Sequence, residues 1–204
     1  AAFSVSLAVA QLTVSVSMVS IALATLIYGP LSDRFGRRPV LLVGLTLFLV
    51  GSVICTFAPD IVSMIVGRSI QAAGGAAGIT LTRAIVRDTV EHDLVASMLA
   101  YLIMAMVVAP MLAPSIGGLI ADWLGWRAIF GFLGLAGVVA LALALRLPET
   151  NAHLTPMPGL VGLIATFLRL LRSPKFTGYA LQGAFSMAVF FTFASSAPHV
   201  VIAL

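Results

Sequence analysis

An arginine and a glutamine lie inside a long apolar stretch at residues 61–86. Arg68 is seven residues from the start of this stretch, and Gln71 follows it by about one helical turn. At a rise of about 1.5 Å per residue, Arg68 would sit roughly 10 Å inside an apolar layer. A charge at that depth is costly unless it faces a wet cavity or a partner, so Arg68 is a functional candidate. The alternative is that its long side chain extends to the outer interface and has no chemical role.

Small and polar residues continue along the same stretch. Helical spacing predicts that Arg68 shares one face with Gln71, Gly75, Gly78 and Thr82. Gly74 and Gly78 form a small-xxx-small pair, which predicts that another helix approaches closely at this point.

A cluster of charges separates the first two apolar runs. Gly29–Arg38 reads GPLSDRFGRR and contains all the charges between the two runs. Short loops rich in arginine remain on the cytoplasmic side of a membrane, so this stretch predicts the orientation of the chain. Pro30 and Gly36 suit a tight reversal between the two runs.

Two charges in this cluster are one helical turn apart and can form ion pairs. Asp33 and Arg37 can make charge-assisted hydrogen bonds to neighbouring helices, and Asp88, at the end of a later apolar run, is the expected partner. The simpler alternative is that these charges only orient the chain in the membrane.

Two prolines four residues apart interrupt a further apolar run. Pro110 and Pro114 each remove a backbone hydrogen bond and predict a kink. Gly117 and Gly118 follow, and they allow bending and close packing. A kink with no functional role is the alternative.

The composition excludes an ordinary soluble domain. Of the 204 residues, 61% are apolar and the mean hydropathy is +1.15. Only 9% are charged, against about 25% in a typical soluble domain. The single cysteine, Cys55, excludes a disulfide framework within one chain. We therefore expect an all-α integral membrane protein that crosses the bilayer several times.

A membrane span needs about 20 apolar residues. Six segments of the chain meet this requirement: 8–29, 39–58, 61–86, 95–120, 127–147 and 176–202. Residues 148–175 differ from these spans. Between Leu160 and Leu171, apolar side chains recur at helical spacing, which predicts a short amphipathic helix on the membrane surface. A half-length seventh span is the alternative reading of that segment.

The basic residues are distributed asymmetrically between the two predicted sides. If Gly29–Arg38 is cytoplasmic, that side holds Arg34, Arg37, Arg38, Arg87, Arg146, Arg169, Arg172 and Lys175, whereas the opposite side holds Arg127 alone. This is the distribution of the positive-inside rule, so the net charge of +4 indicates membrane orientation and not nucleic acid binding.

These motifs, in this order, resemble the major facilitator superfamily. Its members carry Gly-x-Leu-x-Asp-Arg-x-Gly-Arg-Arg between their second and third helices, matched here by Gly29, Leu31, Asp33, Arg34, Gly36, Arg37 and Arg38. Its drug:proton antiporters carry Arg-x-x-Gln-Gly-x-Gly-Ala-Ala in the fourth helix, but here Ala72 and Ala73 separate Gln71 from the first glycine. The Ala-Pro-x-x-Ala-Pro-x-x-Gly-Gly run at 109–118 resembles the twelve-helix Bcr/CflA multidrug-resistance branch.

The resemblance implies a partial fold and a role for each motif. The chain would hold helices two to seven of twelve: an N-terminal bundle without its first helix (1–147), a central cytoplasmic loop (148–175) and the first helix of a second bundle (176–204). Arg68 and Gln71 would take part in proton coupling. The gating loop would be a latch of the outward-facing state, made of Gly29, Asp33, Arg34, Gly36, Arg37, Arg38 and Asp88. Pro110, Pro114, Gly117 and Gly118 would form the antiporter kink motif.

Three helical faces are candidates for a substrate cavity, because methionine and aromatic side chains repack around varied apolar ligands. They carry Gln11, Ser15 and Met18 in the first span, Tyr101, Met104 and Met111 in the fourth, and Gln182, Ser186 and Phe193 in the last. Ordinary helix packing is the alternative for each of these residues.

We expect a secondary transporter that uses alternating access for proton-coupled efflux of drugs or small organic molecules. The expected location is the bacterial cytoplasmic membrane, and the expected partners are lipid, protons and an apolar or amphipathic substrate, with no nucleic acid. The proton gradient would replace a cofactor, and the complete protein would be monomeric. The alternatives are efflux of a small metabolite and a non-catalytic subunit that needs another chain. An intramembrane enzyme is disfavoured because no span carries an acid, and the three histidines show no metal-ligand spacing.

Overall fold

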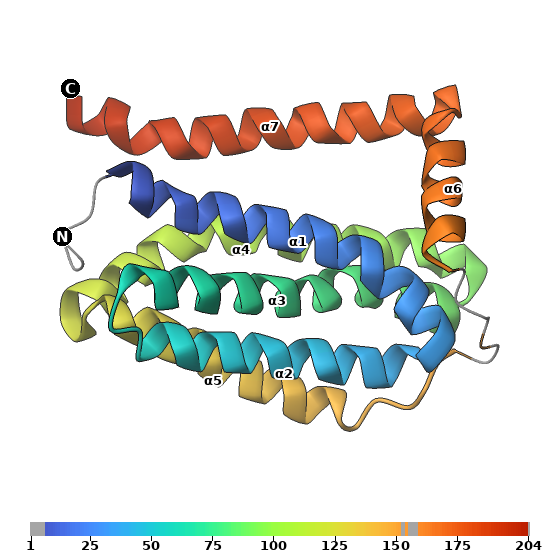
Figure 1. Ribbon diagram of the computed structural model, residues 1–204, viewed down its shortest axis with the longest axis horizontal. Helices are drawn as coiled ribbons and strands as arrows, with labels where there is room; N and C mark the ends of the chain where they lie inside the picture. Colours follow the sequence, from blue (N-terminus) through green and yellow to red (C-terminus); the bar gives the residue numbers. More distant parts are fainter. Residues whose placement is uncertain (1–6, 152–153, 155–158, 204) are drawn as a thin grey trace. The chain divides into compact units, whose positions relative to one another are not determined.

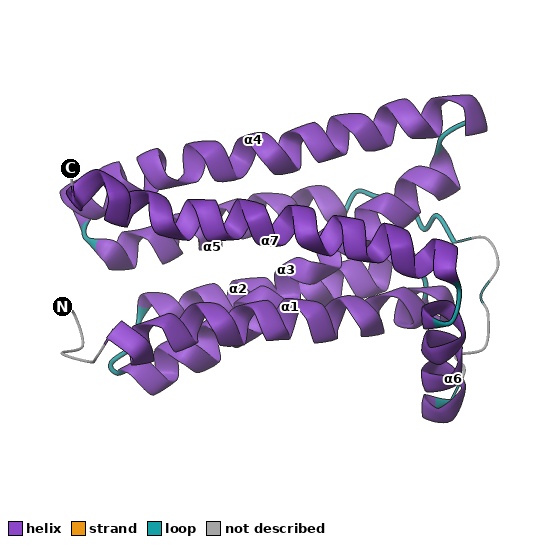
Figure 2. Cartoon of the chain, turned by 90° about the horizontal axis from the view of Figure 1, so that it is seen from above, coloured by secondary structure: helices purple, strands orange, loops and turns teal. Residues whose placement is uncertain are grey.

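The computed structural model describes residues 7–151, 154 and 159–203, and its regular elements within these residues are α-helices. They are α1 (Leu7–Phe35), α2 (Arg37–Thr56), α3 (Ile61–Thr89), α4 (His92–Leu124), α5 (Trp126–Ala144), α6 (Leu160–Leu171) and α7 (Pro174–Ala203) (Figure 1). The chain divides into two compact units, Ala1–Met157 and Pro158–Leu204. The all-helical fold class predicted from the sequence is confirmed in the described residues (Figure 2).

The expected loop at Gly29–Arg38 is almost entirely helical. Helix α1 continues through Pro30 to Phe35 and α2 begins at Arg37, so Gly36 alone lies between them. Helix α1 therefore extends beyond the predicted span of about 8–29, and α2 begins two residues before the predicted span of about 39–58, because helical hydrogen bonding continues where apolar character ends at the first charges. Gly36 reverses the chain with φ +97°, and its N–H donates to the Ser32 carbonyl at 3.1 Å. Side chains are strongly disfavoured at this backbone conformation.

The other connections in the first unit are also short. Val90 and Glu91 separate α3 from α4, and Gly125, with φ +82°, is the single residue between α4 and α5. At the start of α3, Asp60 and Ser63 form a capping box, in which Ser63 N–H donates to Asp60 Oδ1 at 2.8 Å. This cap holds the pKa of Asp60 below its ordinary value through the Ser63 N–H. Consecutive helices joined this tightly run antiparallel (Figure 1).

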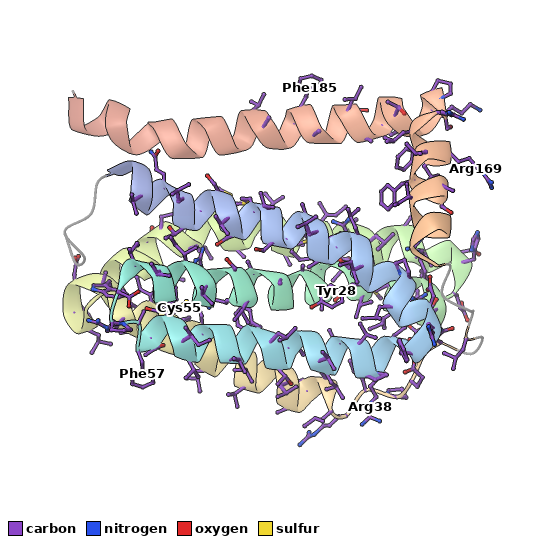
Figure 3. All side chains as sticks on the ribbon, in the orientation of Figure 1. Tyr28, Arg38, Cys55, Phe57, Arg169 and Phe185 are labelled. Carbon is purple, nitrogen blue, oxygen red and sulfur yellow. The ribbon has the colours of Figure 1, made fainter. Side chains whose placement is uncertain are left out.

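Helices α2 and α3 pack closely through glycines. A Cβ on Gly51 would overlap the backbone of Gln71, and a Cβ on Gly74 would overlap the backbone of Phe48. Tyr28 lies in the neighbouring core with residues of α1, α2, α3 and α5 (Figure 3). The close approach predicted at Gly74 is therefore present, but among the described residues no atom of another element lies within 4 Å of the site of a Cβ on Gly78.

Helix α4 is the most exposed helix of the first unit. It runs for 33 residues through both Pro110 and Pro114, and none of its residues is buried. Within the described chain, Gly117 and Gly118 face open space, so no close packing occurs at these glycines. The functional role of the proline motif stays a prediction.

Four helices are long and apolar enough to cross a membrane. They comprise Gln11–Phe35, Arg37–Thr56, His92–Leu124 and Trp126–Ala144. Helices α3 and α7 have 29 and 30 residues, but neither belongs to this group in the described residues. The structure thus supports a protein with several spans, and the count of six stays a prediction.

The second unit contains α6 and α7 joined by Arg172 and Ser173. The predicted short helix is present as α6, whose 12 residues extend about 18 Å, too short to cross a bilayer. Thr177 Oγ1 donates to the Leu171 carbonyl at 2.7 Å and fastens the junction between the two helices.

Candidate functional site

Arg37 links three helices at one end of the first unit. Its Nε donates to Asp88 Oδ2 on α3 at 3.1 Å, and its Nη1 donates to Asp33 Oδ1 on α1 at 2.5 Å. The same Nη1 donates to Ser32 Oγ at 2.6 Å. Its side chain is 14% exposed, so water screens these bonds less than it screens an open surface pair. The expected contact between Arg37 and Asp88 is therefore present, and Asp33 also pairs inside this unit.

Arg38 adds a fourth helix to the same end. Its Nη2 donates to the Leu145 carbonyl at the C-cap of α5 at 2.8 Å, where a cation favours the negative end of the helix dipole. Figure 3 places Arg38 where α1 ends and α2 begins. Arg34 lies over its neighbour Phe35, 5.0 Å from the ring centroid. We call Asp33, Arg37, Arg38 and Asp88 the charge node.

A carboxylate with no role predicted from the sequence, that of Glu149, binds two backbone N–H groups of the charge node. Glu149 Oε1 accepts the backbone N–H of Arg37 at 2.8 Å, and Oε2 accepts that of Arg38 at 3.1 Å. Partial desolvation would raise the pKa of Glu149, but the backbone N–H groups of Asn151, Arg37, Arg38 and Thr150 outweigh it and hold the pKa below its ordinary value. A signal was available: Gly36, the N-cap of α2, has no side chain, so an acceptor for the first N–H groups had to come from elsewhere.

Arg68 begins a chain of hydrogen bonds that crosses from α3 to α2. Its Nη1 donates to Gln71 Oε1 at 3.0 Å, and Gln71 Nε2 donates to Ser52 Oγ at 2.8 Å. The guanidinium also lies 5.8 Å from the centroid of the Phe130 ring on α5. Gln71 and Ser52 are 2% and 1% exposed, so their bond is shielded from water. In the described part of the chain, the ion pairs involve Arg37 and neither of them reaches Arg68.

Arg68 and Gln71 line a pocket of about 240 Å³ inside the first unit. The lining comes from α1, α2, α3 and α5 and is mostly apolar: Val14, Ser17, Met18, Ile21, Phe48, Arg68, Gln71, Ala72, Gly75, Ala76, Ile79 and Leu133. The arrangement places one fixed positive charge and one buried amide beside an apolar space. It suits an amphipathic ligand better than a strongly polar one.

The predicted cavity residues are spread over several surfaces. Met18 lines the Arg68 pocket, but Gln11 and Ser15 are exposed and do not contribute to it. A second pocket of about 310 Å³ lies between α3 and α4 and includes Arg83 and Met106. The other predicted residues outside these pockets are the exposed Tyr101, Met104, Met111, Gln182 and Ser186, while the side chain of Phe193 is outside the described residues. Their roles stay predictions.

The described residues contain no group of three His, Cys, Asp or Glu side chains that could hold a metal ion. Cys55 is a free thiol, fully buried at the end of α2. The arrangement around Arg68 and at the charge node offers hydrogen bonding and fixed charge.

Comparison with known proteins agrees with this geometry. The Major Facilitator Superfamily profile matches residues 1–203. The chain is 35% identical to the uncharacterized MFS-type transporter YdgK of Bacillus subtilis over 97% of the chain and 50% of that protein. It is 37% identical to a chloramphenicol resistance protein of Pseudomonas aeruginosa over 92% of the chain and 44% of that protein. The chain thus spans about half the length of these curated relatives.

A solved structure shares the fold at low sequence identity. The xylose transporter XylE from Escherichia coli, in a partially occluded inward-open conformation, superposes with a TM-score of 0.63 at 17% identity. The match covers 89% of this chain and 49% of that one. The profile match over nearly the whole chain, together with relatives above 30% identity, establishes that this chain belongs to the Major Facilitator Superfamily of membrane transporters.

Proposed function

We propose that this chain serves proton-coupled efflux of drugs or small organic molecules across the bacterial cytoplasmic membrane. The observation that carries the proposal is Arg68, which is hydrogen-bonded to Gln71 beside an apolar pocket in the helical bundle. Transport by alternating access would rock two helical bundles around a site near the middle of the membrane. In this proposal α3 and α7 join the four apolar helices as membrane spans, and α6 lies on the membrane surface.

Arg68 would act as a fixed charge in this mechanism. A guanidinium does not lose its proton in proteins, so Arg68 cannot itself carry protons. It instead favours the ionised form of any acid that approaches it and disfavours a second cation. Gln71 and Ser52 hold the guanidinium in place through their hydrogen bonds. Protonation of an approaching group and occupancy of the pocket would thus depend on one another.

The charge node would close one end of the bundle. Arg37 pairs with Asp33 and Asp88 on two other helices, so separation of α1 or α3 from α2 must break one of these bonds. The node therefore favours one conformation of the bundle. In this proposal the proton gradient supplies the energy for transport, and no cofactor takes part. Lipid, protons and an apolar or amphipathic molecule are the proposed partners of a monomer.

The relatives guide the choice of substrate for a test. Chloramphenicol is the first compound to try, because a relative is described as a chloramphenicol resistance protein. Efflux of a small metabolite by the same mechanism is the second candidate. The exposed length of α4, with no buried residue, favours a third candidate, a subunit that another chain covers.

The test substitutes Arg68 in the protein expressed in a drug-sensitive strain. Arg68→Ala should abolish resistance with an unchanged amount of protein in the membrane, whereas Arg68→Lys should retain part of it. Arg83→Ala is the matched control, because Arg83 lies on the same helix but outside the Arg68 pocket, and in the described chain its guanidinium hydrogen-bonds to Met106 Sδ at 3.9 Å. Full resistance in Arg68→Ala would refute the coupling role.

A further inference from the structure

The segment that follows α5 caps the beginning of α2. The first N–H groups of an α-helix have no partner within the helix. Glu149 accepts the first two of α2, from Arg37 and Arg38, with one carboxylate oxygen each. It lies 112 positions from Arg37 in the sequence, and its negative charge also favours the positive end of the helix dipole.

The same segment caps the end of α1. Asn151 Nδ2 donates to the carbonyls of Ser32 at 3.3 Å and Asp33 at 3.2 Å. These carbonyls belong to the last turn of α1, where many acceptors lack helical partners, and that of Ser32 also accepts the Gly36 N–H. Glu149 Oε1 also accepts the N–H groups of Thr150 and Asn151 at 3.0 and 2.9 Å, which folds the segment around its own carboxylate. Two residues thus fasten the facing ends of two consecutive helices.

Gly36 gives the carboxylate access to the helix end. A Cβ at position 36 would overlap Glu149 Oε2, so any larger residue would displace the cap. The glycine of the charged motif therefore serves two requirements, the positive φ of the reversal and the space for Glu149. By contrast, a Cβ at Gly29 in the same motif would meet no atom of another element within 4 Å in the part of the chain that the structure describes.

We propose that Glu149 and Asn151 form a clasp that positions Arg37 for its ion pairs with Asp33 and Asp88. Arg37 is held by its backbone N–H to Glu149 and by its guanidinium to the two aspartates. Loss of the clasp frees the first turn of α2, and the guanidinium then loses its alignment.

The first test measures the clasp without reference to transport. In Glu149→Gln, backbone amides 37 and 38 should exchange with deuterium about 2- to 30-fold faster, the range expected for loss of a helix cap. Glu91→Gln is the matched control, since Glu91 is the N-cap residue of α4 and makes no side-chain cap bond. It should leave the exchange of residues 36–41 unchanged. Unchanged exchange in Glu149→Gln would overturn the clasp itself.

The second test asks whether the clasp acts through the ion pair, and it rests on the proposed transport function. Glu149→Gln should lower the maximal rate of efflux with little change in KM. In an Asp88→Asn background the same change should have no further effect, because coupled residues are not additive. Additive losses would overturn the positioning role. A wild-type protein without efflux would refute the proposed function, while the exchange result would still decide the clasp.

Discussion

Gly36→Ala should remove two contributions to stability at the charge node, the favourable backbone conformation of glycine and the Glu149 cap on α2. Its backbone, φ +97° and ψ 155°, lies in a region open almost only to glycine, where another residue costs about 1–3 kcal/mol. The added Cβ would also displace the Glu149 carboxylate from α2, and loss of a helix cap costs about 0.5–2 kcal/mol. Together the two effects predict a loss of roughly 3 kcal/mol.

Gly125→Ala isolates the backbone contribution. Gly125 also precedes a helix and has nearly the same conformation, φ 82° and ψ 161°, but a Cβ there would meet no atom of the described residues within 4 Å. It should lose only the conformational part, about 1–3 kcal/mol. The difference between the two variants, roughly 1 kcal/mol, is then the contribution of the Glu149 cap.

The chain provides its own reporter for this measurement. Cys55 is the single cysteine and is fully buried, so a thiol-reactive fluorogenic dye labels it only after unfolding. A loss of about 3 kcal/mol should lower the melting temperature by about 9 °C in a chain of this size, and Gly125→Ala by about two thirds of that. Equal losses in the two variants would refute the contribution of Glu149, as would an unchanged difference in a Glu149→Ala background.

Two further predictions concern the same node. Exchange of Arg37 and Asp88 should partly rescue the efflux lost in either single charge reversal. The rescue stays partial because the carboxylate introduced at position 37 would face Asp33. A double variant no better than the single variants would contradict the pairing. Because backbone N–H groups lower the pKa of Glu149 in the folded chain, its contribution to stability is complete above its ordinary value of 4.5 and is lost as the pH falls through the lowered value. Melting temperatures measured from about pH 7 to about pH 3 should therefore fall less steeply in Glu149→Gln than in the wild type, and parallel curves would exclude this contribution.

Local features of the sequence were enough to predict the helical class and several contacts. The spacing of Asp33 and Arg37 placed these two charges one helical turn apart, and Asp88 was the expected partner because it ends a later apolar run on the same predicted side of the membrane. Gly74 was likewise identified as a point of close helix approach.

Features that depend on distant segments were not predictable in this way. Glu149 contacts α2 across more than 100 positions, and no local pattern connects the two. The pocket-facing side of α1 also differs from the expected one, since Val14, Ser17 and Ile21 line the pocket with Met18. Polar character suggested Gln11 and Ser15, whereas the direction of each side chain is set by how α1 packs on α3.

The strength of the charge node bears on how a proposed latch could open. Asp33 is 47% exposed and Asp88 is 27% exposed, and ion pairs of that exposure contribute about 0–1 kcal/mol each. The hydrogen bonds of Glu149, Asn151 and Arg38 each add a similarly modest amount. A latch made of one strong buried bond would trap the protein in one state. Several weak bonds that share one helix end can hold a closed state together and separate one at a time.

The opposite end of the unit has fewer such links between helices in the described residues, among them Arg127 Nη2 to the Ala58 carbonyl at 3.0 Å. The node is thus the end at which loss of one small contact, such as the Glu149 cap, should change the balance between two conformations most.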